Sequence, residues 1–377
     1  MKKIFKMRKN SIAGCKKSLE EMEIPAKHKL THISERAFAG NEIVKGINIP
    51  GNIRIIGYSA FEGAKALQRV SFALAGMVII KDRCFKKCKK LTEIENMSII
   101  ISYGDEAFKG CESLKNCDIN PYLVEFGKGC FEGCKKITEV TLPFLHSVVP
   151  ARAFYECEGL NTVNFCQALE VIGEKAFYGC ISLGELTFTE NLKKIAASAF
   201  EDCYNISKIS FGGNVKKIDK NAFKNCRSLN TVEFTSIDGN KKVTIKSGTF
   251  NGCSELKKIV IPNGKWSISA GAFRNCRLSA ESPLNIYCED ETTAKMISAK
   301  LSALVKKGHV NVVCSVEVGV EAEADIVSVE TQNTEDIQDN VPEEKTEDLK
   351  EDPEEKDVMP ENIEEQSLAD IFEEDNK

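Results

Sequence analysis

The 377-residue sequence predicts an α/β repeat solenoid of about eleven coils, each about 23 residues long. Three observations predict this fold. Phenylalanine recurs at a nearly constant spacing, a cysteine usually follows it three residues later, and a run of alternating apolar residues comes next. Self-similarity at a fixed period of this length is typical of stacked repeats, in which each repeat contacts only its neighbours.

The first eleven residues are a basic segment, residues 1–11, and a degenerate repeat around Ile12 and Cys15 follows it. The N-terminus carries the charges of a signal peptide but lacks its apolar core of about 7–15 residues and its cleavage site. No stretch approaches the roughly 18 apolar residues of a membrane-spanning helix. We therefore expect a cytoplasmic protein with reduced thiols. A cell-surface or secreted protein whose leader is missing or bypassed is the alternative.

The phenylalanines that frame the repeats define the length of each coil. Eight of the ten spacings between them are 23 residues, and the other two are 24 and 27. A small residue, usually Ala, precedes each of them. In a solenoid, equivalent positions lie about 4.8 Å apart along the axis, so we expect each framing ring to stack on the next. The framing residues are Phe38, Phe61, Phe85, Phe108, Phe131, Phe154, Phe177, Phe200, Phe223, Phe250 and Phe273.

The cysteine of each repeat, from Cys88 to Cys276, raises the question of a metal array, a disulfide ladder or a packing ladder. Zinc needs four converging ligands, commonly CxxC pairs or histidines, and one thiol per repeat with four His in the chain does not supply them. Thiols that point inward in parallel do not face one another as a disulfide requires. Buried cysteine behaves as a small apolar residue. The sequence therefore predicts a packing ladder, with neither a metal site nor a cofactor site.

After the cysteine, each repeat predicts one strand. The segments LGELTF (183–188) and ISKISF (206–211) place apolar residues at alternate positions, as in a strand with one buried face. An Asn such as Asn191 follows, and we expect it to hydrogen-bond backbone groups where the chain leaves the strand. A proline such as Pro143 suits a strand end because it has no N–H to donate. A further apolar residue, such as Ile195, lies five residues before the next framing Phe and is expected to point inward.

The combined pattern LxxLxLPxxNxxxIxxxAFxxCxx resembles the BspA-like, or treponemal-type, leucine-rich repeats. Those repeats occur in bacterial surface adhesins and in large protein families of anaerobic protists. The match covers residues 12–276. The resemblance implies a right-handed superhelix with a parallel sheet on its concave side, and a protein-binding or adhesive role.

Residues 277–318 are expected to cap the solenoid with a strand, a helix and a second strand. The segment LNIYC (284–288) predicts the first strand and residues 309–318 the last. Between them, residues 291–308 predict an amphipathic helix that would cover the apolar surface of the final coil. A helix that binds a partner is the alternative. The apolar face of this helix consists of Ala294, Ile297, Leu301 and Leu304.

The composition of residues 319–377 predicts a disordered acidic tail. Residues 316–377 contain 24 acidic residues and four lysines, which leaves 47 basic and 32 acidic residues, a net charge of +15, in the rest of the chain. We expect the tail to associate loosely with basic surface and to shield it from acidic partners. Leu368, Ile371 and Phe372 have the spacing of a short partner-binding helix. A terminal segment without a role is the alternative.

The sequence lacks the motifs of the common catalytic sites. No P-loop, GxGxxG in strand context, HExxH or nucleophile elbow is present. We therefore expect a protein without enzymatic activity. Lysine pairs such as 193–194 and 216–217 would stack in adjacent repeats, but no aromatic residues interleave with them. This disfavours nucleic acid as a partner.

The outward side of the predicted sheet is the candidate functional surface, and it indicates a protein–protein interaction scaffold. Its side chains are small and polar, without the Trp, Tyr or Arg residues typical of binding hot spots. A solvated sheet face without a partner is the alternative. The sequence defines neither the identity of the partner nor the oligomeric state. The candidate partner-binding residues are Asp118, Thr141, Asn164, Thr187, Lys208, Ser210 and Glu233.

Overall fold

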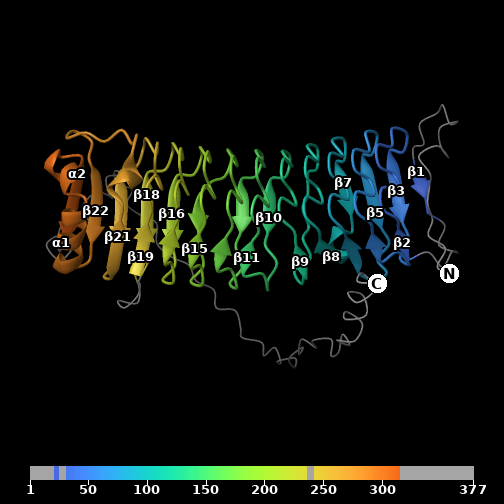
Figure 1. Ribbon diagram of the computed structural model, residues 1–377, viewed down its shortest axis with the longest axis horizontal. Helices are drawn as coiled ribbons and strands as arrows, with labels where there is room; N and C mark the ends of the chain where they lie inside the picture. Colours follow the sequence, from blue (N-terminus) through green and yellow to red (C-terminus); the bar gives the residue numbers. More distant parts are fainter. Residues whose placement is uncertain (1–20, 25–30, 236–241, 315–377) are drawn as a thin grey trace, which may run out of the picture. The chain divides into compact units, whose positions relative to one another are not determined.

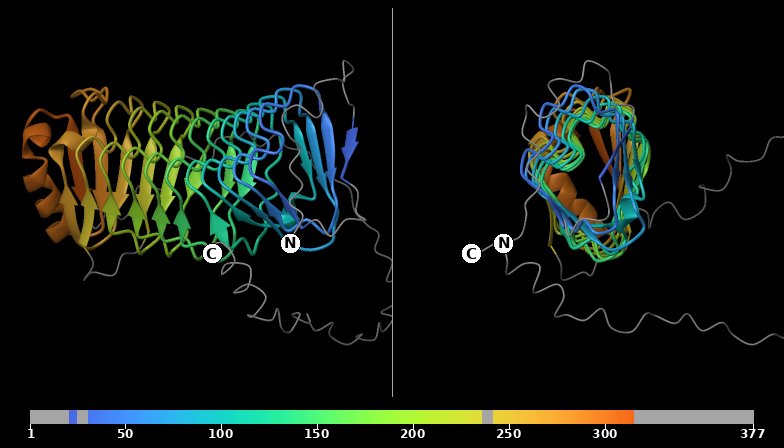
Figure 2. Two further views of the ribbon diagram at one scale, coloured as in Figure 1. Left: turned by 45° about the vertical axis from the view of Figure 1, so that its right-hand side comes forward. Right: turned by 90° about the vertical axis from the view of Figure 1, so that its right-hand side faces the viewer.

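The computed structural model describes residues 21–24, 31–235 and 242–314. Over this part the chain winds into a stack of about twelve coils (Figure 1). Viewed along the stack, successive coils superimpose on one another around a filled interior (Figure 2). The repeat solenoid that the 23-residue period predicts is therefore confirmed.

The chain divides into two units, Met1–Glu323 and Ala324–Lys377, and the second lies outside the described residues. The basic segment 1–11, the degenerate repeat around Ile12 and the acidic tail 319–377 also lie outside them, as does the end of the predicted last strand.

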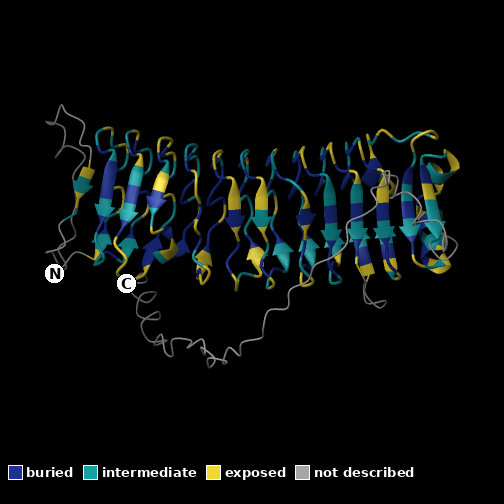
Figure 3. Cartoon of the chain, turned by 180° about the vertical axis from the view of Figure 1, so that it is seen from behind, coloured by how far each residue is buried: buried dark blue, intermediate teal, exposed yellow. Residues whose placement is uncertain are grey.

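Each coil except one contributes a strand to one side of the solenoid, here called the strand face, and all pairings are parallel. In β16, Ile209 and Phe211 are buried whereas Lys208 and Ser210 are half-buried, as period-two spacing predicts. Figure 3 shows buried and more exposed residues along the strands. The strands of this face are β1 (Glu21–Glu23), β3 (Gly46–Ile49), β5 (Arg69–Phe72), β7 (Glu93–Glu95), β10 (Glu139–Thr141), β12 (Thr162–Asn164), β14 (Leu186–Thr187), β16 (Lys208–Phe211), β18 (Thr231–Phe234), β20 (Lys258–Ile261), β22 (Leu284–Cys288) and β23 (Val310–Cys314).

A second set of parallel strands, which the sequence did not predict, occupies another side of the coils. The inward residue five positions before each framing Phe, such as Ile195, belongs to these strands and is buried as expected. Most of the strands are two residues long, so they offer no alternation that a sequence pattern could reveal. They are β2 (His32–Ile33), β4 (Ile55–Ile56), β6 (Val78–Ile80), β8 (Ile100–Tyr103), β9 (Glu125–Phe126), β11 (Val148–Val149), β13 (Val171–Ile172), β15 (Lys194–Ile195), β17 (Lys217–Ile218), β19 (Lys242–Ile245) and β21 (Lys265–Ile268).

The Ala-Phe-x-x-Cys segments form the remaining side, here called the turn face, as consecutive turns. Residues two positions before and after the framing Phe have left-handed backbones, with φ of 55° at Ser198 and 64° at Asp202. Because of this alternation, the N–H groups of Ser198, Phe200 and Asp202 donate to carbonyls of the next coil at 3.0, 2.7 and 2.8 Å. The intervening N–H groups bond within the coil, as Glu201 does to Ser198 at 3.2 Å. The turns therefore add a third hydrogen-bonded ladder.

The framing phenylalanines stack in one continuous column through the interior. Centroids of successive rings lie 4.8–5.9 Å apart with interplanar angles of 2–10°. Phe200, for example, is fully buried and stacks on Phe177 at 5.1 Å and on Phe223 at 5.2 Å. The predicted column of rings is confirmed.

The cysteine column packs beside the rings and also makes hydrogen bonds that the sequence did not predict. Each thiol from Cys88 to Cys276 donates to the carbonyl of the framing Phe in the preceding coil, at 3.0–3.3 Å. Burial raises the pKa of Cys88 to about 12, which keeps that thiol protonated. The fifteen cysteines of the described residues are free thiols. The predicted inward packing is confirmed for the fully buried members, such as Cys203.

The C-terminal elements cover the end of the solenoid. The predicted strand 284–288 is present as β22, and β23 pairs with it in the same sheet. The predicted helix is divided in two, α1 (Glu291–Lys300) and α2 (Ser302–Lys306), because the backbone leaves helical geometry at Leu301. Asp290 caps α1 by accepting from the Thr293 N–H at 2.9 Å. Within the described residues, these two α-helices are the only ones. Ile297 and Leu301 are buried and Ala294 and Leu304 are partly buried, as the predicted apolar face requires.

We predict that Phe200→Ala lowers the free energy of unfolding by about 3–5 kcal/mol, because it removes a buried ring and leaves a cavity. Cys203→Ser is expected to cost less, about 1–3 kcal/mol, because the shorter serine side chain places its hydroxyl farther from the Phe177 carbonyl in an apolar slot. Urea denaturation measures both. The control is wild-type protein with a reductant or a chelator, which is expected to leave the midpoint unchanged. Unfolding by either reagent would contradict the packing role of the thiols.

Candidate partner-binding surfaces

The seven predicted residues carry the polar side chains of the strand face, but they do not form one continuous row. Thr141 on β10 pairs with Asn164 on β12, and Thr187, Ser210 and Glu233 pair in register on β14, β16 and β18. These two groups belong to separate sheets. Asp118, Thr141, Asn164 and Thr187 are exposed, whereas Lys208, Ser210 and Glu233 are half-buried.

Several of these side chains bind one another across neighbouring coils. The Asn164 amide donates to the Glu139 carboxylate at 3.0 Å and to the Thr141 hydroxyl at 3.1 Å. The Lys208 ammonium lies 2.8 Å from a carboxylate oxygen of Glu233. The hydrogen bond and the negative charge of Glu233 raise the pKa of Lys208. The row is therefore partly preorganised.

The strand face extends one coil farther than its predicted polar part and gains an aromatic residue there. Glu233 pairs with Val260 on β20, and Val260 pairs with Tyr287 on β22. The Lys258 ammonium lies 5.6 Å from the centroid of the Tyr287 ring. Sequence analysis missed Tyr287 because it assigned residues 284–288 to the cap. The period-two spacing of that segment was the signal that could have placed Tyr287 on the outward side.

Asp118 lies apart from the other six, at an interruption of the strand face. β7 pairs only with β5 and β10 only with β12, so residues 116–118 belong to no sheet. Cys117 stands here where Ile94 and Val140 of neighbouring coils point inward. A hollow of about 410 Å³ opens at this point, lined by residues 115–119 and 138–141. Sequence analysis missed it, although a small residue at a position otherwise filled by Ile, Leu or Val was a usable signal.

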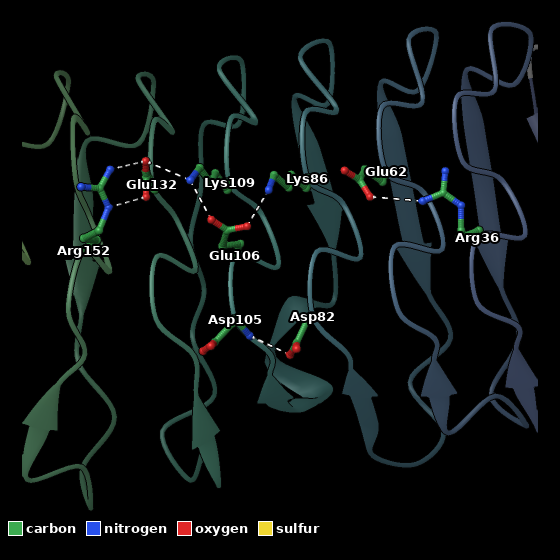
Figure 4. Close-up of polar contacts among 9 residues, drawn as sticks. All are labelled: Arg36, Glu62, Asp82, Lys86, Asp105, Glu106, Lys109, Glu132 and Arg152. Carbon is green, nitrogen blue, oxygen red and sulfur yellow. Dashed lines mark hydrogen bonds and ion pairs between the residues drawn. The ribbon is translucent and has the colours of Figure 1, made fainter. Parts of the chain in front are cut away.

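The turn face carries a chain of ion pairs that sequence analysis also missed (Figure 4). The Glu132 carboxylate accepts from Arg152 through Nε at 2.9 Å and Nη2 at 2.6 Å, and the Lys109 ammonium lies 3.3 Å from it. Lys109 and Lys86 both donate to Glu106, at 2.7 and 2.6 Å. Opposite charges about one repeat apart in the sequence were the signal for these contacts.

An aromatic pair continues this chain of contacts along the turn face. The Arg152 guanidinium lies 3.8 Å from the centroid of the Tyr155 ring, which stacks on Tyr178 at 4.8 Å. A hydrogen bond to the Asp202 carboxylate is the main cause of the raised pKa of Tyr178. The polar groups here bind neighbouring coils, so this face mainly holds the stack together.

Two searches of the described residues bear on the kind of site that is present. No group of three or more His, Cys, Asp or Glu side chains converges as metal ligands in that part of the chain. None of its helices is long and apolar enough to cross a membrane.

Comparisons with known proteins give one family and several similar structures. The family model for the BspA type leucine rich repeat region (six copies) matches residues 5–138, 73–183 and 147–279. No curated protein matches the chain significantly. Among solved structures, a leucine-rich repeat protein from Bacteroides ovatus is 20% identical, with 78% of this chain and 91% of that chain covered and a TM-score of 0.48. A leucine rich cell surface protein from Faecalibacterium prausnitzii is 20% identical, with 79% and 88% covered and a TM-score of 0.41. The pneumococcal vaccine antigen PcpA is 16% identical, with 78% and 79% covered and a TM-score of 0.45.

We predict that Glu106 makes part of the stability dependent on pH. Burial raises the pKa of Glu106, but the hydrogen bonds and charges of Lys109 and Lys86 outweigh it, so its pKa lies below the ordinary value. A carboxylate with a lowered pKa stabilises the fold above its unfolded pKa, and this stability is lost as the pH falls through the folded pKa. Glu106→Gln should therefore flatten the decline in unfolding free energy between about pH 5 and 3. Urea denaturation over that range measures the slope.

The matched control for this prediction is Glu93→Gln, which changes an exposed glutamate on the strand face. The control should keep the wild-type slope. If Glu106→Gln also kept it, the ion pairs of the turn face would not contribute to stability as argued.

Proposed function

The chain belongs to the BspA-type leucine-rich repeat family, and from this premise we propose that it is a non-enzymatic scaffold that binds a protein partner through its strand face. Leucine-rich repeat families are generally non-catalytic repeat proteins. The observation that carries the proposal is the in-register row from Thr187 through Ser210, Glu233 and Val260 to Tyr287. Its spacing is fixed by the backbone ladders, so a partner meets side chains that are already ordered.

The composition of this row favours a protein over other partners. Polar residues able to donate or accept hydrogen bonds occupy its middle, and Val260 and Tyr287 give it an apolar end. Tyrosine is enriched among binding hot spots because it buries a large ring and keeps a polar group. Fixed strand geometry lowers the conformational entropy that binding costs. We infer that the polar part sets the orientation of the partner and that Tyr287 anchors it.

The acidic tail is proposed to modulate this binding by charge. Its 24 acidic residues and four lysines belong to the same chain as a remainder with a net charge of +15. Tethering gives the tail a high effective concentration near the rest of the protein. Single exposed ion pairs are weak, so the expected effect is a competition with acidic partners that salt weakens.

We propose a cytoplasmic location, for which the free thiols of the described residues give support. Thiols persist in reducing compartments, whereas extracellular proteins tend to form disulfides. A cell-surface or secreted adhesin is the alternative. Fractionation of cells that express the native protein distinguishes the two, and recovery outside the cytoplasm would favour the adhesin.

We predict that Tyr287→Ala weakens binding of a protein partner at least about tenfold, because hot-spot truncations cost about 2 kcal/mol or more. Partners are captured from cell extract on the full chain and identified, and their affinities are measured with purified proteins. The matched control is Arg274→Ala, which removes an exposed side chain from the turn face. Unchanged binding by Tyr287→Ala, or an equal loss in both variants, would contradict binding through the strand face.

A second prediction concerns the tail. A chain that ends at Glu317 should bind a polyanion such as heparin much more tightly than the full chain at low salt. The difference should shrink at physiological ionic strength, where the Debye length is about 8 Å. Titration at both salt concentrations measures the effect. Equal affinities at low salt would leave the tail with no competing role.

A further inference from the structure

Exposed apolar side chains gather in one small area of the solenoid. Ten large apolar side chains are exposed in the described residues, and half of them lie between residues 122 and 148. The most exposed are Leu145 at 74%, Tyr122 at 67% and Phe144 at 55%. The rings of Tyr122 and Phe144 meet edge to face, with centroids 6.3 Å apart. With Val124 and Val148, these residues form what we call the loop patch.

The fold does not require apolar residues at these positions. The loop patch lies where the chain passes from the strand face to the second set of strands, and this loop recurs in every coil. At the position equivalent to Tyr122 and Leu145, two later coils carry Asn191 and Asn214. A monomer rarely exposes neighbouring large apolar side chains unless they bind something.

The loop patch is continuous with the hollow at the interruption of the strand face. Residues 115–119, which line the hollow, lead into Tyr122, and residues 138–141 lead into Phe144. Tyr103 lies beneath this region, fully buried, and its hydroxyl has no hydrogen-bond partner. Burial raises the pKa of Tyr103, and nearby Cys117 and Asp118 raise it further. A coil with an unpaired strand segment and an orphaned buried hydroxyl departs from the otherwise consistent repeat, and such departures mark functional sites.

The size of the loop patch indicates a short binding segment and not a second copy of the chain. From the exposed fractions and the 150–250 Å² that an aromatic side chain offers, the patch presents roughly 500 Å². A stable interface between two folded proteins needs about 800 Å² on each partner. The hollow and the patch together suit a segment a few residues long that inserts one or two side chains.

The charges around the hollow indicate what accompanies the apolar side chain. Asp118, Glu125 and Glu139 are exposed beside it, against one exposed lysine, Lys115. This local excess of negative charge contrasts with the positive net charge of residues 1–315. Complementary charge across an interface steers association and excludes wrong partners.

We propose that the hollow and the loop patch form a docking site for a short segment of a partner protein that carries an aromatic or aliphatic anchor flanked by Arg or Lys. The anchor packs against the rings of Tyr122 and Phe144, and the basic residues face Asp118 and Glu139. This inference rests on the proposed function, because it assigns a second, sequence-selective contact to the same scaffold.

The test selects phage-displayed random 12-residue peptides on the full chain. We expect the selected peptides to combine apolar anchors with Arg or Lys and to bind Tyr122→Ser/Phe144→Ser at least tenfold more weakly. Asp118→Lys should weaken them several-fold. The matched control is Ile181→Ser/Tyr204→Ser, which removes two exposed apolar side chains from adjacent coils elsewhere and should bind like wild type. Thermal unfolding checks that each variant is folded.

The remaining outcomes overturn the proposal. Peptides that bind both double variants equally, or no selected peptide at all, would remove the docking site. A dimer seen by sedimentation that Tyr122→Ser/Phe144→Ser abolishes would assign the patch to a second copy. Binding to phosphatidylcholine vesicles that the same variant abolishes would assign it to a lipid surface. Tyr287→Ala separates the two proposals, because loss of peptide binding only in the loop-patch variant supports docking even if the strand face binds nothing.

Discussion

The distance between coils is the constraint on which the rest of the structure depends. Backbone hydrogen bonds set it on three sides, through two sets of parallel strands and through the turns, in which left-handed residues aim alternate N–H groups at the next coil. At this distance, identical side chains at equivalent positions fall into contact. A flat ring stacks well at about 5 Å, and a small thiol fills the space beside it. The repetition of Phe and Cys is therefore a consequence of backbone spacing, because each coil packs against a copy of itself.

Sequence reasoning recovered the features that repeat and missed those that depend on the path of the chain between repeats. The column of rings, the buried thiols and strands such as β16 follow from period and alternation. The two-residue strands were invisible because one inward residue has no period. The bonds from thiols to Phe carbonyls depend on which backbone group lies opposite. Tyr287 was misplaced because its coil lacks a framing Phe, and the hollow arises from Cys117, a substitution within an otherwise regular pattern.

The faces of the solenoid differ in how much of their polar chemistry is used within the protein. On the turn face, Glu106, Glu132 and their basic neighbours bind from coil to coil, and the Tyr155–Tyr178 pair continues that chain. On the strand face, contacts such as Lys208 with Glu233 order the surface but leave Thr187 exposed. The departures from regularity, at Cys117 and in the loops around Tyr122 and Phe144, lie on and beside the strand face. Binding capacity and irregularity are thus found together.

The two repeats that exceed 23 residues show where this architecture tolerates a change of length. In both, the added residues fall between a strand of the strand face and the next short strand: between β5 and β6 in the 24-residue repeat, and between β18 and β19 in the 27-residue repeat. An insertion anywhere else would shift every later ring and thiol out of its column. Insertions, deletions and new side chains can therefore accumulate along this single edge during evolution. The solenoid can acquire a new specificity there while its interior continues to be copied from coil to coil.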